Sequence, residues 1–433
     1  MKDGDAMLIE FQVENFGSIR ERQALSLVAS KPVKEHQEAN SFLADGSDPK
    51  SSLRLLRSAV IYGANAAGKS NLVRGLFRMQ QFVLSSDLGG AVGPGVPEQP
   101  SLPKAAMPFV PFKLDEAWKE KPSRFEATFV LDGVRHQYGF ALDRAGVKEE
   151  WLVAYPKGRP QTLFERGANQ ADGWYLNRAL GPKTKDLVAR TRKDALFVSV
   201  GARWNHPVLS RIYEWFKSHV KWIDNQVPWD YTILRMETDR AFKDQLLTFL
   251  RLADLDIVDV QIERSQAQQF QLDLVQRKAV FSDGEVLEPR LLHKLSSGEG
   301  SVAFHPVEES LGTVKYLTLA GPWLDVLANG YTLVMDELET HLHPLLAQKL
   351  VEIFHSPKHN PKNAQLIFTT HLPLLMDTEL MRRDQIWFVE KNNEGASSLY
   401  PLTDFSPRKQ EAIQKGYLAG RYGAVPMLGE ETD

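Results

Sequence analysis

Residues 63–70 read Gly-Ala-Asn-Ala-Ala-Gly-Lys-Ser, which fits the pattern G-x-x-x-x-G-K-[ST] at every fixed position. The two glycines, Gly63 and Gly68, allow backbone angles and close approaches that a Cβ atom would block. The loop amides can then converge on phosphate oxygens, and the N-terminus of a following helix adds a favourable dipole. Lys69 is expected to reach the outer phosphates, and the Ser70 hydroxyl to bind Mg²⁺. The pattern predicts a nucleotide phosphate site, and the alternative is a glycine-rich turn.

The segments on either side of the loop are those that this chemistry needs. The apolar stretch SAVIYG, residues 58–63, predicts a buried strand before the loop. Residues 69–84 have helical spacing, with their apolar side chains near one face. We therefore expect nucleotide contacts along the whole loop and one residue beyond it, from Gly63, Ala64, Asn65, Ala66, Ala67, Gly68, Lys69, Ser70 and Asn71.

A phosphate loop needs a carboxylate partner for the metal, and the stretch YTLVMDELETHLHP supplies one. Residues 331–335 predict an apolar strand that delivers Asp336 and Glu337 at its carboxyl end. Asp336 is expected to hold Mg²⁺, and Glu337 to orient and deprotonate the attacking water. The alternative is a pair of surface acids at the end of a strand.

Histidines follow both of the predicted strands. The stretch AQLIFTTHLPLL predicts another buried strand, which ends at Thr369, Thr370 and His371. At the tip of a neighbouring parallel strand, His371 is placed to contact the γ-phosphate, and a structural role is the alternative. Four further histidines raise the alternative of a zinc site, although the first two fit a turn after the catalytic strand: His341, His343, His355 and His359.

Together these segments resemble the ATP-binding-cassette (ABC) class of ATPases, which transporters share with the SMC chromosome proteins. The resemblance implies a signature segment that closes in trans over ATP bound to a second protomer. Its serine opens the helix that leads to the metal-binding strand. Ser310 precedes Asp336 by 26 residues, close to the spacing of that class, and a helical pattern follows it. We therefore assign the signature to residues 310–313, with Ser310 and Gly312 as nucleotide contacts; a plain helix cap is the alternative.

A second serine-glycine segment, KLSSGEGS at residues 294–301, competes for the same role. Its Ser296 lies 40 residues before Asp336, and a strand-like stretch follows it instead of a helix. We therefore predict a turn at 295–301.

More narrowly, the chain is similar to bacterial AAA/ABC-like, SMC-related ATPases of the anti-phage and abortive-infection type, such as the Rlo-type ATPases. The resemblance rests on IEFQVENFGSIRE, GANAAGKSNL, PFKLD, MDELETHLHP, NAQLIFTTH, RRDQIWFVEK and KGYLAGRYGAVP. It implies a companion effector protein, often a nuclease, and places residues 15–18 near the nucleotide base and residues 111–115 near a sensing loop. Arg421 and Tyr422 are expected to be exposed.

The chain-wide pattern predicts an α/β fold of the ABC ATPase type, with a parallel-sheet P-loop core, an antiparallel β subdomain and a compact helical insertion. The stretch FEATFVLDGVRHQYGFALD predicts a hairpin with its turn at Asp132-Gly133. Residues 87–108 are rich in Gly and Pro and predict a flexible connection. Residues 256–305 predict short strands. The expected domains are a first ATPase lobe at 1–160, an insertion at 161–305 and a second ATPase half at 306–433.

Composition narrows the function classes. The net charge of −3 means that any nucleic-acid contact needs a local basic patch, for which the basic segment 183–193 is a candidate; a solvated helix face is the alternative. The chain has no cysteine, which excludes disulfides and thiolate metal sites and fits a cytoplasmic protein. No apolar run reaches the length of a membrane span, so no membrane partner is expected. The N-terminal residues have no signal-peptide pattern, and Met7 is an alternative start.

These patterns favour a cytoplasmic ATPase, with ATP and Mg²⁺ as cofactors, that dimerises head to tail around two nucleotides. Its expected purpose is to gate a partner effector in anti-phage defence. An SMC-like DNA-repair ATPase is one alternative, although the net charge and the lack of a long coiled-coil pattern argue against it. A non-hydrolysing ATP-sensing scaffold is another, and the presence of Glu337 argues against that.

Overall fold

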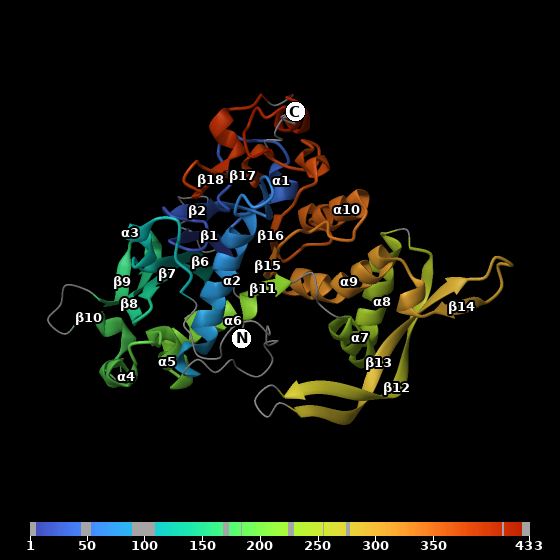
Figure 1. The fold of residues 1–433 in the computed structure, drawn as a ribbon, viewed down its shortest axis with the longest axis horizontal. Helices are drawn as coiled ribbons and strands as arrows, with labels where there is room; N and C mark the ends of the chain where they lie inside the picture. Colours follow the sequence, from blue (N-terminus) through green and yellow to red (C-terminus); the bar gives the residue numbers. More distant parts are fainter. Residues whose placement is uncertain are drawn as a thin grey trace, which may run out of the picture. The chain divides into compact units, whose positions relative to one another are not determined.

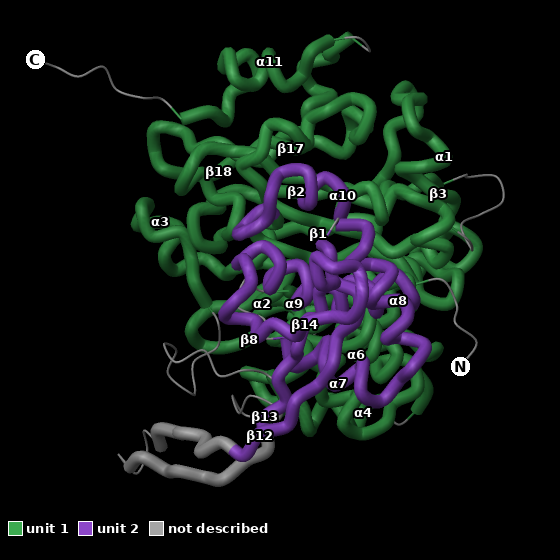
Figure 2. The backbone as a smooth tube through the Cα atoms, turned by 90° about the vertical axis from the view of Figure 1, so that its right-hand side faces the viewer, with its two compact units in different colours: residues 1–223, 329–338, 351–433 green, residues 224–328, 339–350 purple. Residues whose placement is uncertain are grey.

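The computed structural model divides into two compact units (Figure 2). The first comprises residues 1–223, 329–338 and 351–433, and the second comprises residues 224–328 and 339–350. This division rests on compactness, and the three domains expected at 1–160, 161–305 and 306–433 stay a prediction. The structure describes residues 6–44, 53–88, 109–167, 173–182, 184–223, 229–253, 255–273, 278–408 and 411–426, without the side chains of 267–285. The predicted connection at 87–108 lies almost wholly outside them.

A largely parallel sheet forms the centre of the first unit (Figure 1). Its strand order is β11-β15-β16-β5-β17-β18, and only the edge strand β18 runs antiparallel. The strands β5, β15 and β16 are buried apolar runs, as expected for a parallel sheet covered on both faces. The strands are β5 Ser58–Tyr62, β11 Val220–Ile223, β15 Thr332–Met335, β16 Gln365–Thr369, β17 Ile386–Lys391 and β18 Ser397–Pro401.

The helix α2, Lys69–Ser85, follows β5 after the glycine-rich loop, as predicted. It buries Leu72, Val73, Leu76 and Met79, which lie on the face expected from their spacing. Short elements complete the unit around the sheets: α1 Gln37–Asn40, β3 Ser41–Leu43, β4 Arg54–Leu56, α3 Glu116–Lys119, α4 Thr184–Arg190, α5 Phe197–Arg203, α6 Pro207–His219 and α11 Ile413–Leu418.

The first unit also contains a seven-stranded antiparallel sheet of order β10-β9-β8-β7-β6-β1-β2. The predicted hairpin is β6–β7, and its turn residues Asp132 and Gly133 have φ of 53° and 72°. Positive φ at both positions belongs to a two-residue turn that matches the twist of the strands. The strands are β1 Met7–Glu14, β2 Gln23–Ser26, β6 Ser123–Leu131, β7 Val134–Asp143, β8 Gly146–Tyr155, β9 Gln161–Arg166 and β10 Trp174–Leu176.

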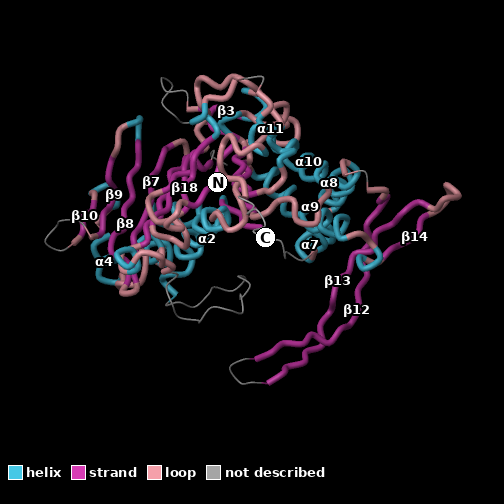
Figure 3. The backbone as a smooth tube through the Cα atoms, turned by 45° about the horizontal axis from the view of Figure 1, so that its top comes forward, coloured by secondary structure: helices cyan, strands magenta, loops and turns pink. Residues whose placement is uncertain are grey.

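The second unit combines helices with a three-stranded antiparallel sheet (Figure 3). Its elements are α7 Asp230–Thr238, α8 Arg240–Arg251, β12 Ile257–Asp273, β13 Lys278–Lys294, β14 Ser301–Phe304 and α9 Leu311–Asn329. The helix α10, Pro344–His355, begins in this unit and ends in the first.

The expectation of short strands between 256 and 305 is confirmed for β14 and wrong for β12 and β13. Both β12 and β13 have 17 residues, and they pair without interruption from Asp259 and Leu292 to Asp273 and Lys278. The polar residues in the middle of each strand look like a break in the sequence. They continue the ladder because the backbone groups of a strand form its hydrogen bonds whether its residues are polar or apolar.

The described part of the chain contains no helix that is both long and apolar enough to cross a membrane.

The α/β architecture expected from the sequence is present with all three of its predicted parts: a parallel P-loop sheet, an antiparallel β region and a helical insertion.

Candidate nucleotide site

The glycine-rich loop leaves the carboxyl end of β5 in the conformation that a phosphate loop needs. Ala66 and Gly68 have φ of 61° and 113°, in the region where residues with a side chain are strained. A Cβ atom on Gly63 would lie 2.4 Å from the carbonyl oxygen of Val389 in β17. The first glycine of the motif is therefore required by a close backbone approach as well as by the loop itself.

Lys69 lies at the first position of α2 and is buried. Its Nζ donates to the carbonyl oxygens of Gly63 at 2.8 Å and Ala64 at 3.2 Å, so the ammonium is drawn over the loop that it belongs to. Both contacts are with neutral acceptors, which a phosphate oxygen would outcompete because charged acceptors form stronger hydrogen bonds.

The two acidic residues stand where β15 ends. Thr369, the last residue of the neighbouring β16, links them: its hydroxyl donates to Asp336 Oδ1 at 2.7 Å and accepts the Glu337 amide at 2.8 Å. The Leu338 amide also donates to the Thr369 carbonyl, at 3.1 Å. Thr369 therefore fixes the side chain of the predicted metal ligand and the backbone of the predicted base together. From the sequence, Thr369 was predicted only to lie at the end of this strand, and its hydrogen bonds to the acidic pair were not predicted.

Glu337 has φ of 52° and an exposed side chain. A non-glycine residue in the left-handed region is strained, and strain of this kind gathers at functional sites. The hydrogen bond from the Glu337 amide to Thr369 helps to hold that conformation. The turn carries the carboxylate away from the sheet and leaves it accessible.

Two further side chains lie along this edge. His371 follows β16 by two residues and is exposed, as its predicted contact with phosphate requires. Arg74, on the exposed face of α2, places Nη2 at 3.8 Å from Asp336 Oδ2. This arginine was not selected in the sequence, because its spacing from Lys69 matches no fixed position of the motif.

The residues predicted to hold magnesium fit that ion in kind. Ser70 and Asp336 offer a hydroxyl and a carboxylate oxygen, and magnesium prefers oxygen ligands with few protein groups beside phosphate and water. Within the described residues, no group of three or more His, Asp or Glu side chains gathers in a way that would hold a metal. The zinc alternative finds no support in His355, which is buried and hydrogen-bonded to the Ser58 hydroxyl at 2.8 Å. Burial, together with Arg57, lowers the pKa of His355 to about 3.

Two residues of the segment 15–18, Gly17 and Ser18, lie against the start of α2. Asn71, predicted to contact nucleotide, donates from Nδ2 to the Ser18 hydroxyl at 2.8 Å. Asn15 is fully buried. Its side-chain Oδ1 accepts the Phe112 N–H at 2.8 Å, and its Nδ2 donates to the Lys121 carbonyl at 2.6 Å. Asn15 therefore fastens the PFKLD segment to β1, whereas Ser18 borders the start of α2.

The predicted signature lies in the second unit. Ser310 directly precedes α9, and its hydroxyl accepts the Thr313 amide at 3.0 Å, as an N-cap does. Gly312 lies in the first turn of the same helix. The competing segment forms the turn between β13 and β14, as predicted, with the Leu295 amide donating to the Gly300 carbonyl at 3.2 Å.

The expectation that Tyr422 is exposed is wrong. Its side chain is 1% exposed, its ring stacks on Phe388 at 5.9 Å, and its hydroxyl donates to Glu411 at 2.5 Å. Arg421 is exposed and pairs with the same Glu411 at 2.6 Å. The GRYGAVP segment therefore closes an aromatic cluster over β17.

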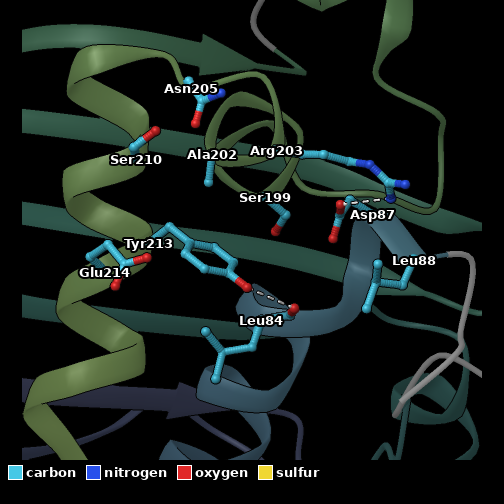
Figure 4. A pocket seen from close by; sticks show the side chains of 10 residues that line it. All are labelled: Leu84, Asp87, Leu88, Ser199, Ala202, Arg203, Asn205, Ser210, Tyr213 and Glu214. Carbon is cyan, nitrogen blue, oxygen red and sulfur yellow. Dashed lines mark hydrogen bonds and ion pairs between the residues drawn. The ribbon is translucent and has the colours of Figure 1, made fainter. Parts of the chain in front are cut away.

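A cavity of about 270 Å³ lies at the other end of α2 (Figure 4). Its wall includes Asp87 and Arg203, which form an ion pair at 3.3 Å, and Tyr213, whose hydroxyl donates to the Leu84 carbonyl at 3.2 Å. None of the predicted site residues lines it. This cavity is separate from the phosphate loop.

A family model described as "AAA domain, putative AbiEii toxin, Type IV TA system" matches residues 58–377. The chain belongs to this AAA-domain family. The matched region begins at β5 and ends just after β16, so it includes the phosphate loop, the Asp-Glu pair and His371. The β17–β18 hairpin of this AAA-domain protein and its Tyr422 lie beyond the match.

Three solved structures are distant neighbours of this AAA-domain chain. An SMC head domain from Thermotoga maritima is 14% identical, with 91% of this chain and 98% of that chain covered and a TM-score of 0.38. An SMC head bound to the C-terminal winged-helix domain of ScpA is 14% identical, with 91% and 96% covered and a TM-score of 0.41. CbiO1 from Clostridium perfringens, part of the ABC transporter complex CbiONQ, is 10% identical, with 95% and 96% covered and a TM-score of 0.32. The chain has no match among curated proteins.

Proposed function

We propose that this protein is a Mg²⁺-dependent ATPase. The observation that carries the proposal is the Thr369 hydroxyl, which ties Asp336 and the backbone of Glu337 together at the sheet edge where the phosphate loop also begins. One strand, β16, separates the loop strand β5 from the acidic strand β15. This arrangement supports a single ligand shared by the phosphate loop and the two carboxylates.

The residues of this chain have separate tasks in the proposed reaction. The loop amides and Lys69 bind the β- and γ-phosphates, and Ser70 and Asp336 hold magnesium, which neutralises charge on those phosphates. Glu337 accepts a proton from the attacking water, and His371 contacts the γ-phosphate from the next strand. Catalysis of this kind depends on positioning and electrostatic stabilisation, so the network around Thr369 is part of the machinery.

We further propose that two protomers close head to tail, each supplying Ser310 and Gly312 to the ATP held by the other. The start of α9 supports this, because Leu311 is 71% exposed and the nearby Val307 is 81% exposed. Large apolar side chains at such exposure are suited to burial by a partner.

The proposed purpose of the ATPase cycle is to gate a companion effector in anti-phage defence. The support is the family description, which names a toxin of a toxin–antitoxin system, and the resemblance to abortive-infection ATPases. A non-hydrolysing ATP sensor is the second candidate; it would bind ATP in the same loop but release no phosphate.

The substitution Lys69→Ala tests the assignment of the phosphate loop. Loss of a charged donor facing phosphate should weaken Mg²⁺-ATP binding by about 10- to 100-fold, measured by isothermal titration calorimetry. The exposed Lys185 on α4 offers a control, and Lys185→Ala should bind like the unaltered protein. Equal affinity of the Lys69→Ala variant, with an unchanged thermal melting curve, would refute the assignment.

A further inference from the structure

The carbonyl oxygen of Ala67, in the phosphate loop, is held by a residue of the β17–β18 hairpin. Ser397 is 1% exposed, and its hydroxyl donates to Ala67 O at 2.5 Å. The Ser397 amide donates to the carbonyl of Ser18 at 2.8 Å, and the two serine hydroxyls lie 2.7 Å apart. Ser397 therefore stands between the loop and the turn that follows β1.

The directions of these hydrogen bonds follow from counting protons. Each serine hydroxyl has one proton to donate. Because Ser397 uses its proton on Ala67 O, Ser18 donates to Ser397. Because Ser18 uses its proton in that way, it accepts from Asn71 Nδ2, at 2.8 Å. The result is a single chain of hydrogen bonds from Asn71 through both serines to Ala67, with each hydroxyl donating once and accepting once.

Anchoring the Ala67 carbonyl also fixes the next amide. The peptide unit is planar and trans, so the N–H of Gly68 points opposite to the C=O of Ala67. With the carbonyl turned toward Ser397, the Gly68 N–H is turned away from the hairpin. That side of the loop is where the following amides, at the N-terminus of α2, are available to an anion.

The fit around Gly68 is close. A Cβ atom at this position would lie 2.2 Å from Ser397 Oγ and 2.6 Å from Ser18 Oγ. The second glycine of the motif is therefore needed so that the two hydroxyls can approach the loop, in addition to its φ of 113°.

We propose that Ser397 is a positioning residue for the nucleotide site, which aims the Gly68 amide at the phosphates by holding the preceding carbonyl. The proposal rests on the proposed function for its ligand, and it adds a residue outside the region that the family model matches. Donors held in place before a ligand arrives stabilise it at a lower cost in ordering.

The experiment compares Ser397→Ala with Ser398→Ala, a matched control on the same strand whose side chain is exposed. Calorimetry with Mg²⁺-ATP should show affinity reduced about two- to tenfold for Ser397→Ala, the range expected for one lost hydrogen bond, and unchanged for Ser398→Ala. In steady-state kinetics KM should rise by the same factor while kcat is unchanged, because the amide binds phosphate in both ground and transition states.

A second measurement does not need nucleotide. The amides of Asn71 and Leu72 donate to the Gly68 carbonyl, so a looser Gly68 should release them. Hydrogen–deuterium exchange should therefore rise at these two amides in Ser397→Ala and not in Ser398→Ala. Ser18→Ala, which leaves the bond from Ser397 to Ala67 in place, should have a smaller effect.

The outcomes separate the two proposals. If the unaltered protein fails to bind Mg²⁺-ATP, the proposed function is wrong, and the exchange data still test the hydrogen-bond chain. If the unaltered protein binds and Ser397→Ala matches Ser398→Ala in affinity and exchange, Ser397 does not position the loop. A fall in kcat at constant KM would also overturn the proposal.

Discussion

The carboxyl edge of the parallel sheet and the start of α9 carry the two halves of the proposed ATP site, and they are built differently. At the sheet edge, Asp336 and Glu337 are linked through Thr369, and Lys69 is bonded to its own loop. At the start of α9, Ser310 bonds only within its own turn among the contacts described, and Leu311 next to it is exposed.

In the proposed head-to-tail dimer, each of these two regions has a different task. At the sheet edge, hydrogen bonds from Thr369 join the carboxyl ends of the neighbouring strands β15 and β16. The start of α9 has a capped helix and exposed apolar side chains, and the proposed dimer assigns this surface to the second protomer. Substitutions in the two regions should therefore fail in different ways.

The largest effect is expected at the sheet edge. Glu337→Gln should lower ATP turnover by roughly 10²- to 10⁴-fold, the usual worth of a positioned general base, while Mg²⁺-ATP still binds. It should also accumulate the closed dimer, visible by light scattering with ATP. Glu379→Gln, at an exposed position after β16, is the control and should turn over normally. Normal turnover by Glu337→Gln would show that another group is the base.

The next effect is expected at the start of α9. Gly312→Arg should lower turnover by about 10²- to 10³-fold, as loss of preorganised donors does, and should prevent ATP-dependent dimerisation while sparing ATP binding. A Cβ atom on Gly312 would lie 3.1 Å from the carbonyl oxygen of His341, so this neighbour must shift slightly to accept any side chain. Mixing this variant with Lys69→Ala protomers should restore part of the activity, because one composite site regains both halves.

A control for that variant is available in the competing turn. Gly298 has φ of 82°, so a side chain there is strained in any case, and Ser297→Arg is the cleaner substitution. It should leave turnover near normal. If Ser297→Arg abolishes activity and Gly312→Arg does not, the signature lies at 295–301.

The smallest effect is expected from Thr369→Val, which keeps the shape of the side chain and removes the hydroxyl. Asp336 loses a donor and the Glu337 amide loses its acceptor, so kcat should fall about tenfold, as for groups that orient a metal ligand. Thr370→Val is the matched control, because its hydroxyl accepts the Leu372 amide and touches neither acid. The Thr370→Val variant should have a lower melting temperature and a nearly unchanged kcat. If Thr369→Val and Thr370→Val have the same kcat, Thr369 has no role in catalysis.

The sequence predicted the parts of the fold and site that depend on residues close together in the chain. The strand, loop and helix around Lys69 were predicted because glycine spacing and apolar periodicity are local, and the same holds for the turn at Asp132-Gly133. Thr369 and Ser397 gained their roles only in three dimensions, since their partners lie 33 and 330 residues away. Their residue types give no separate signal.

The prediction for Tyr422 was wrong. It accompanied the family resemblance, whereas in the structure Phe388, Tyr400 and Tyr417 form an aromatic cluster beside the buried tyrosine. The length of β12 and β13 was missed because polar residues in a ribbon do not mark the end of a strand.

The position of β5 in the sheet has a consequence for the synthesis of the protein. This strand pairs on one side with β16 and on the other with β17, yet β16 begins about 300 residues after β5 ends. At roughly 5–20 residues per second, the ribosome needs about 15–60 s to cover that interval. During that time both edges of an entirely buried apolar strand lack their partners, which exposes the nascent chain to aggregation and to chaperones. The phosphate loop is thus made long before the strands that frame it, so a chain interrupted between β5 and β16 would carry the motif without its sheet neighbours.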